Sequence, residues 1–119
     1  MKVFESKNIS ISVNRSPAQV YDFISNRENL PLWASGLESM ENIKIKFAEK
    51  NIFGVVDHDV TLATGTTFHN PMRVLPNGDG SEVVFTLFRR PEMSNDKFES
   101  DANWVLGDLK KLKSILESN

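Results

Sequence analysis

The sequence predicts an α+β domain in which a curved antiparallel sheet wraps around a long C-terminal helix. Three observations lead to this fold class. Apolar and polar residues alternate, as they do in strands, over most of residues 43–89. An apolar stripe at helical spacing then runs from Phe98 to Leu116. The expected hairpin loops place the apolar residues of successive strands on one face, and a helix with one apolar stripe packs against such a face.

The N-terminal part predicts one strand followed by two short helices. Ile9, Ile11 and Val13 alternate with polar residues, which indicates a half-buried strand. Residues 16–19 read Ser-Pro-Ala-Gln, a capping box with proline at the first helical position, and they predict a helix from there. A second short helical turn is expected over residues 28–33.

The middle of the chain predicts an antiparallel meander with a consistent register. Three loops of three or four residues separate the alternating runs, and Gly65 stands where a three-residue hairpin favours a left-handed residue. All three loops bring the apolar sets onto one side of a single sheet. The expected loops are 48–51, 63–65 and 77–80, which place Phe47 opposite Ile52, Leu62 opposite Thr66, and Pro76 opposite Ser81.

The last element is expected to be a long helix that begins after Ser94, a suitable N-cap residue. Acidic residues follow in its first turn and lysines stand near its end, as the helix dipole favours. Its apolar residues follow 4-3-4-3-4 spacing and form one stripe: Phe98, Ala102, Val105, Leu109, Leu112 and Leu116.

Length and composition limit the function classes. The 119 residues suit one domain, 1–119, with a single core. The chain has no cysteine, which excludes disulfides, thiolate catalysis, iron–sulfur clusters and cysteine-based zinc sites. A net charge of −2 argues against nucleic-acid binding. No apolar run approaches the ~20 residues of a transmembrane helix, and the N-terminus lacks the apolar segment of a secretory signal, so we expect a cytoplasmic protein.

The order of elements resembles the helix-grip fold of the SRPBCC superfamily. That superfamily includes START lipid-transfer domains, birch-pollen-allergen-like proteins and polyketide cyclase/dehydrase-like proteins. The resemblance covers nearly the whole chain, is closest to small bacterial members, and implies a cavity between sheet and helix for a lipid, a polyketide-like aromatic or an isoprenoid. The segments that carry it are residues 11–13, 16–24, 30–33, 54–61, 71–78 and 81–89.

The sequence departs from the superfamily pattern after Trp33. Members commonly carry an extra hairpin there, but only about nine residues separate Trp33 from Ile43, too few for two strands and a turn at ~3.3 Å per residue. We therefore expect a shorter sheet, with a cavity that is smaller, open at one edge, or closed by a second subunit.

Three polar residues fall on the predicted apolar face. Strand parity places His58 there, the hairpin register puts Asn70 directly opposite it, and Arg89 is expected on the neighbouring strand, opposite Phe68. Unpaired burial costs about 1–3 kcal/mol for each polar group, so a partner must satisfy them. One interpretation is a polar patch that orients a ligand, with His58 as an acid or base. The alternative is a structural His–Asn hydrogen bond, with Arg89 reaching solvent.

The predicted pocket walls are otherwise apolar, and we expect no cofactor and no metal. Asp57, Asp59 and His69 fall on the opposite face, where one histidine and two loosely placed carboxylates do not make a convergent ligand set. Asp59 and His69 should form a cross-strand pair. The expected walls are Trp33, Val56, Val60, Phe68, Met72, Phe85, Phe98 and Val105.

These residues leave three functional hypotheses open. The favoured one is a protein that binds a small hydrophobic or amphipathic ligand without catalysis. The second is a cyclase- or dehydrase-like enzyme in which His58 moves a proton. The third is a protein-interaction module, as in the co-chaperones of the superfamily, or a homodimer, because Val55, Val84 and Phe88 form an apolar strip on the outer face.

Overall fold

The computed structural model describes residues 2–35 and 42–118 and confirms the expected fold class. Six strands and three α-helices, with one short 3-10 turn, follow the predicted order among these residues. In chain order they are β1 (Ser6–Val13), α1 (Pro17–Ser25), the 3-10 turn (Arg27–Asn29), α2 (Leu30–Trp33), β2 (Lys44–Phe47), β3 (His58–Thr61), β4 (Thr67–Asn70), β5 (Met72–Asn77), β6 (Gly80–Phe88) and α3 (Asn95–Glu117).

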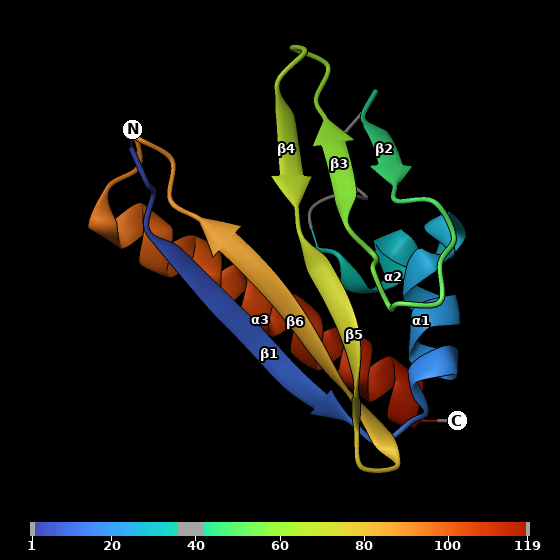
Figure 1. Ribbon diagram of the computed structural model, residues 1–119. Coiled ribbons are helices and arrows are strands. Elements are labelled where there is room, and N and C mark those ends of the chain that lie inside the picture. The colour runs from blue at the N-terminus through green and yellow to red at the C-terminus, as the bar shows by residue number, and fades with distance from the viewer. Residues whose placement is uncertain (1, 36–41, 119) are drawn as a thin grey trace.

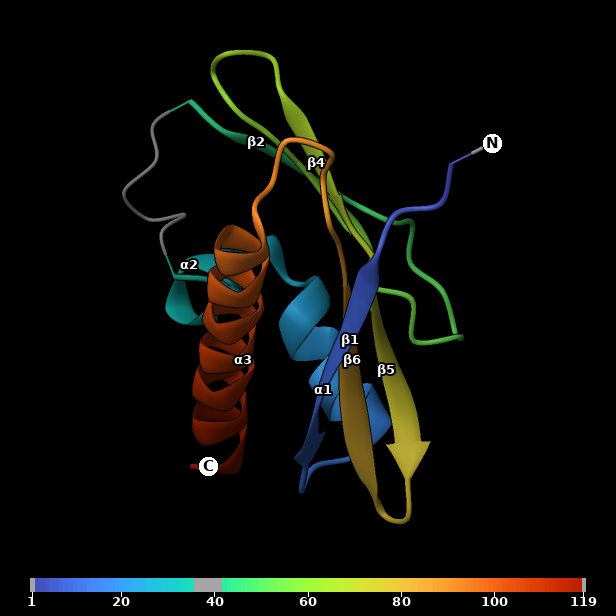
Figure 2. The same cartoon turned by 90° about the vertical axis from the view of Figure 1, so that its left-hand side faces the viewer.

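The long helix α3 lies against the sheet formed by β1, β6 and β5 (Figure 1). A view turned by 90° shows α3 and the strands as two layers, with α1 beside them at one end of the molecule (Figure 2). The strands β4, β3 and β2 extend beyond the far end of β5, so the strands continue past the part that α1 covers. As a result, α3 and the β2–β3–β4 sheet lie on opposite sides of the region that α1 does not cover.

Local sequence signals explain where the helices begin. The Ser16 side chain accepts the backbone N–H of Gln19 at 3.3 Å, and the Gln19 side chain accepts the backbone N–H of Ser16 at 3.2 Å, which completes the capping box. The Ser94 side chain accepts the backbone N–H of Lys97 at 3.1 Å at the start of α3. Both predicted helix starts are confirmed.

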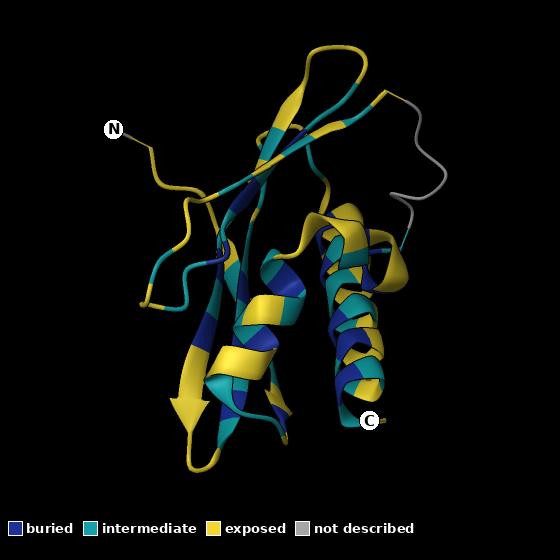
Figure 3. Cartoon of the chain, turned by 90° about the vertical axis from the view of Figure 1, so that its right-hand side faces the viewer, coloured by how far each residue is buried: buried dark blue, intermediate teal, exposed yellow. Residues whose placement is uncertain are grey.

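The core lies where α1, α3 and the β1–β6–β5 sheet face one another (Figure 3). Five residues of the predicted α3 stripe are buried, and Val105 is half-buried. Full burial of a phenylalanine or leucine side chain stabilises the fold by about 1.5–3 kcal/mol, and four of these five residues are of those types. The buried stripe residues are Phe98, Ala102, Leu109, Leu112 and Leu116.

The prediction of one continuous sheet was wrong: the described strands form two three-stranded sheets, β1–β6–β5 and β2–β3–β4. The break falls at Pro71, which separates β4 from β5 and has no N–H to donate. Beside it, the Asp57 carboxylate accepts the backbone N–H of Met72 at 2.8 Å. A side chain thus replaces a carbonyl in the ladder, and only the isolated bridge between Val55 and Arg73 continues the pairing.

The predicted four-residue loop after Phe47 was also wrong. Phe47 pairs with His58, not with Ile52, so the connection runs over residues 48–57. The Asn51 side chain organises it, because its Oδ1 accepts the backbone N–H groups of Phe53 and Val55 at 3.0 and 3.1 Å. The alternation of apolar and polar residues in this segment gives no sign that the Asn51 side chain binds backbone N–H groups that would otherwise pair with a strand. Ile52 consequently lies 92% exposed, outside the apolar face.

The other two hairpins have the predicted registers. The backbone N–H of Leu62 donates to the Thr66 carbonyl at 2.8 Å, and Gly65 adopts a φ of 91°. Pro76 pairs with Ser81. The shortened connection expected after Trp33 includes residues 36–41, which lie outside the described residues.

Candidate functional site

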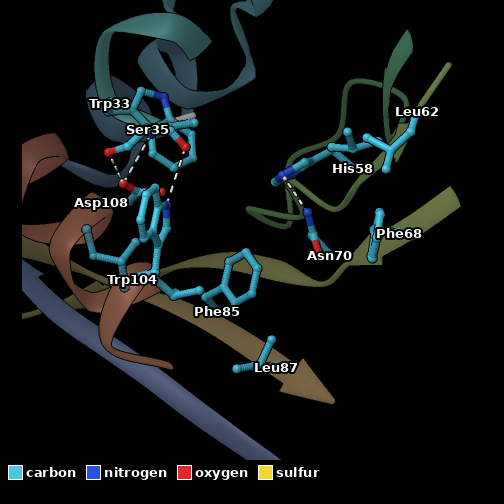
Figure 4. A pocket seen from close by; sticks show the side chains of 14 residues that line it. Trp33, Ser35, His58, Leu62, Phe68, Asn70, Phe85, Leu87, Trp104 and Asp108 are labelled. Atoms are coloured by element: carbon cyan, nitrogen blue, oxygen red, sulfur yellow. Dashed lines mark hydrogen bonds between the residues drawn. The ribbon is translucent and has the colours of Figure 1, made fainter. Parts of the chain in front are cut away.

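A pocket of about 320 Å³ opens between the β2–β3–β4 sheet, the end of α2 and the middle of α3. The lining residues come from α3 and the end of α2 on one side and from β3, β4 and β6 on the other, so the pocket lies between the helices and the strands. Its lining is mainly apolar: Ala34, Val60, Leu62, Phe68, Phe85, Leu87, Val105 and Leu109, together with Trp33 and Trp104. The polar lining residues are Ser35, His58, Asn70 and Asp108 (Figure 4).

His58 is the first residue of β3 and is almost fully buried, with 4% of its surface exposed. Its Nδ1 lies 3.1 Å from the Val56 carbonyl oxygen, which can only accept, so Nδ1 carries the proton. Burial lowers the pKa of His58 from its ordinary value, although the Val56 carbonyl and the carboxylates of Asp57 and Asp59 oppose that shift. A neutral imidazole therefore presents Nε2 as a hydrogen-bond acceptor.

Asn70 is the partner of His58 across the β3–β4 ladder, as predicted. Its Nδ2 lies 3.5 Å from His58 Nε2, where the amide N–H is the donor (Figure 4). The Phe47 ring packs 5.1 Å from the imidazole on the other side. The structural hydrogen bond and the polar patch, which the sequence posed as alternatives, thus involve the same pair of side chains, because both residues also line the pocket.

A second polar group stands on the α3 side of the pocket. Asp108 Oδ1 accepts the Ser35 hydroxyl at 2.5 Å and the Ser35 backbone N–H at 3.1 Å. Burial raises the pKa of the Asp108 carboxyl, and the two Ser35 hydrogen bonds partly offset that rise. Asp108 is half-buried, so its carboxylate is less solvated than one at the surface.

Both tryptophans of the chain line the same pocket. Trp104 is 59% exposed at the surface of α3, and its Nε1 donates to the Ser35 carbonyl at 3.3 Å. Trp33, at the end of α2, is buried, and its Nε1 has no acceptor among the residues that the structure describes. Trp104, Ser35 and Asp108 are therefore joined by hydrogen bonds into one cluster.

The structure brings together most of the predicted site residues. His58, Asn70, Trp33, Val60, Phe68, Phe85 and Val105 all line the pocket. Val56 and Met72 do not: they lie in the main core, fully buried beneath it. Phe98 is buried in the first turn of α3, where the Lys7 ammonium lies 5.1 Å from the centre of the Phe98 ring. Strand parity for Val56 and Met72, and helical spacing for Phe98, placed these residues on the buried face, but their position along the molecule removes them from the pocket.

Arg89 does not line this pocket. It follows the end of β6, and its guanidinium donates to the Met93 carbonyl at 3.0 and 3.1 Å and to Asn95 Oδ1. It also pairs with Glu5 at 3.4 Å. Arg89 was expected opposite Phe68, but the strand pairing ends at Pro71 and does not extend that far. The Phe68 ring instead packs against Arg90, whose guanidinium carbon lies 3.9 Å from the centre of the ring. Arg89 therefore holds the connection into α3.

The acidic residues of the outer face are occupied by other partners. Asp59 and His69 form the predicted cross-strand pair, with 2.5 Å between Oδ1 and Nδ1. Asp57 binds Arg73 at 3.0 Å as well as the Met72 backbone. Within residues 2–35 and 42–118, no three histidine or acidic side chains are grouped as a metal would require. In the same residues, no helix is long and apolar enough to cross a membrane.

The sequence matches no protein-family model and no curated protein. Solved structures do match. Protein MLL2253 from Mesorhizobium loti has a TM-score of 0.74 at 9% identity, over 97% of this chain and 98% of that one. Ara h 8.0201 has a TM-score of 0.68 at 10% identity, over 98% and 100%. DynU16, from the dynemicin biosynthetic locus, has a TM-score of 0.72 at 11% identity, and this chain, matched over 94%, spans only 47% of it.

The chain has the helix-grip fold. The fold that the sequence predicted is thereby confirmed. Identities near 10% show the fold alone and carry no information on ligand or reaction. In this helix-grip chain the pocket lies between the long helix and the sheet, where the fold leaves space.

Sequence reasoning missed the polar cluster on the helix side of the pocket. Asp108 lies beside the apolar stripe of α3, between Val105 and Leu109, and an aspartate there is usually solvated. Ser35 is 73 positions away in sequence, and no local pattern links the two. The one signal in the sequence was Trp104, an aromatic residue four positions before Asp108 and therefore on the same side of the helix.

Proposed function

We propose that this protein binds a small, mainly apolar molecule in the pocket between the β2–β3–β4 sheet and α3. The observation that carries the proposal is the pocket itself: about 320 Å³ of space, with an apolar lining interrupted by polar side chains on two opposite sides. Such a composition is typical of small-molecule sites, in which apolar walls supply affinity and a few polar groups fix orientation.

The position of the pocket supports this proposal. Its walls belong to β3, β4, β6, α2 and α3, so they come from ordered elements on both layers of the fold. The His58–Asn70 pair on the sheet carries no net charge, because burial keeps the imidazole neutral, and it can form hydrogen bonds with a ligand. A lipid, a polyketide-like aromatic or an isoprenoid, the classes that the resemblance implies, would each present hydrocarbon to these walls.

A fluorescent probe tests the proposal directly. N-phenyl-1-naphthylamine is neutral at pH 7 and becomes brighter in an apolar site, so a saturable increase is expected with the wild-type protein. Leu87→Trp should weaken this binding about tenfold or more, because Leu87 lines the pocket and the larger ring occupies its space. Native mass spectrometry of gently purified protein should in addition detect any small molecule that it retains.

Leu75→Trp is the matched control for that experiment. Leu75 stands on the adjacent strand β5, is exposed, and does not line the pocket. Its substitution should leave the probe affinity unchanged. Equal loss in both variants, or no saturable binding to the wild type, would contradict the proposed function.

Catalysis by His58 is a second candidate, and one observation favours it. His58 is a neutral imidazole that lines the pocket, the protonation state that a general base requires at neutral pH. Its Nε2 accepts the Asn70 amide N–H at 3.5 Å, so a substrate proton would have to displace that hydrogen bond. In that case His58→Ala abolishes turnover of a bound substrate but leaves the probe affinity within about threefold of wild type. Unchanged turnover in this variant would exclude the role.

A further inference from the structure

Asp108 brings a negative charge into the pocket, and no lining residue in the described part of the chain offsets it. The lining contains no lysine and no arginine, and its single histidine is neutral because burial lowers the pKa of His58. Asp108 also belongs to none of the ion pairs formed among residues 2–35 and 42–118. Lys111 lowers the pKa of Asp108 through its charge, but it is exposed and does not line the pocket.

The carboxylate is held in place rather than left mobile. Both donors of Ser35 reach the same oxygen, Oδ1, at 2.5 and 3.1 Å, and the Trp104 indole N–H fixes the Ser35 carbonyl. No other donor from the described residues binds this carboxylate. A fixed charge in a half-buried, mainly apolar place is costly unless an opposite charge meets it, and the pocket is the side from which one can come.

Two aromatic residues stand beside the carboxylate. Figure 4 shows Trp33, Trp104, Ser35 and Asp108 together on one side of the pocket, with His58 and Asn70 across from them. Tryptophan is the side chain whose ring face attracts cations most strongly. A carboxylate between two tryptophans is a suitable site for an ammonium group attached to hydrocarbon.

We propose that the pocket selects an apolar amine, whose protonated nitrogen binds Asp108 between Trp33 and Trp104 while its hydrocarbon body packs along Val60, Phe85 and Val105. This inference rests on the proposed function, because it names the ligand class of the same pocket. The His58–Asn70 pair then faces the far end of the molecule, where a hydroxyl or carbonyl oxygen has a hydrogen-bonding partner.

A matched pair of ligands tests the charge requirement. 2-Naphthylmethylamine and 2-naphthalenemethanol share one ring system and differ in the ammonium group at pH 7. Displacement of N-phenyl-1-naphthylamine should show that the amine binds the wild-type protein about tenfold or more tightly than the alcohol, as charge-assisted hydrogen bonds predict. Asp108→Asn should reduce that preference to within about twofold, mainly through a loss of affinity for the amine.

Asp101→Asn controls for the loss of one negative charge on α3. Asp101 is on the same helix but pairs with Lys97 and does not line the pocket, so this variant should keep the preference for the amine. Equal binding of amine and alcohol to the wild type, or a preference that survives Asp108→Asn, would overturn the inference. If N-phenyl-1-naphthylamine binds in these cases, the proposed function stands; if no probe binds the wild type, both proposals fail.

Discussion

At the scale of single residues, His58 couples the pocket to the stability of the fold. Its folded-state pKa lies below the ordinary value of 6.5 because of burial. Below pH 6.5, His58 of the unfolded chain therefore binds a proton more readily than His58 of the folded protein. The free energy of unfolding is therefore not reduced by His58 above about pH 6.5. On acidification below that pH, His58 lowers it by at most about 1.4 kcal/mol per pH unit.

The prediction is that His58→Gln flattens this dependence. Urea unfolding at pH 7.5 and pH 5.5 should show a smaller difference between the two pH values in the variant than in the wild type. His69→Gln removes the other histidine, whose charge contributes to lowering the His58 pKa, so it should reduce the difference less than His58→Gln does. An unchanged slope in His58→Gln would show that other groups cause the pH dependence.

Asp108 shows the opposite side of the same linkage. Burial raises its pKa, so the folded state disfavours the carboxylate, and this cost is present above the folded pKa and disappears below the ordinary value of 3.8. Asp108→Asn keeps an oxygen for the Ser35 donors and removes the charge. We expect the Tm of the ligand-free protein to rise by about 1–3 °C at pH 7.5, with a smaller difference at pH 4. Thermal unfolding followed by circular dichroism measures both, and a lower Tm at pH 7.5 would contradict the expectation.

At the scale of elements, the connection between β2 and β3 depends on one glycine. Gly54 has a φ of 75°, and a Cβ there would come within 2.1 Å of the Val74 carbonyl oxygen. Gly54→Ala should therefore cost about 2–4 kcal/mol of unfolding free energy. Gly65 also has a positive φ, of 91°, but has open space around it, so Gly65→Ala should cost only about 1 kcal/mol. Equal costs in urea unfolding would show that backbone conformation, rather than close approach, decides both.

The helix α3 contains the opposite case. Gly107 is an exposed residue in its interior, and apart from its chain neighbours and the helix's own backbone no atom lies within 4 Å of the place where a Cβ would stand. Gly107→Ala should raise the unfolding free energy by about 0.5–1 kcal/mol, because alanine loses less conformational freedom in a helix. A decrease would mean that this position needs a glycine for a reason other than packing.

At the scale of the whole molecule, the two sheets differ in how firmly they are packed. The main buried cluster draws on β1, β5, β6, α1, α2 and α3, whereas Ile45 and Phe47 of β2 lie only at its margin. Amide hydrogens of β2–β4 should therefore exchange faster than those of β1 and β6. N-phenyl-1-naphthylamine should slow exchange in β3 and β4, which form one wall of the pocket, and leave β1 unchanged. Hydrogen–deuterium exchange with and without the probe measures this, and uniform protection of both sheets would contradict it.

The whole-molecule view also bears on self-association. Phe88 is 49% exposed on the outer face, while Val55 and Val84 are half-buried. A homodimer through this strip remains our secondary proposal for that face. Light scattering of the wild type and of Phe88→Glu is the measurement that decides it, since a dimer lost on substitution would support the strip as the interface.

The sequence by itself determined the helices and most of the local strand pairing, but not the Phe47–His58 pairing or the break of the sheet at Pro71. The helix starts at Ser16 and Ser94, the His58–Asn70 register and the apolar stripe of α3 all follow from caps, turns and periodicity, which act over a few residues. Because these signals are local, they suffice to place His58 and Asn70 opposite each other on the apolar face of the sheet.

Only the tertiary structure decided where along the layers the pocket lies and what completes it. The offset of α3 against the sheet places Val105 and Asp108 in the pocket and Phe98 outside it, and the break at Pro71 moves Arg89 away. The Ser35–Asp108 contact joins residues 73 positions apart. Local periodicity specifies which face of an element is buried but not which part of the opposing layer it meets, because that choice depends on how all the side chains pack together.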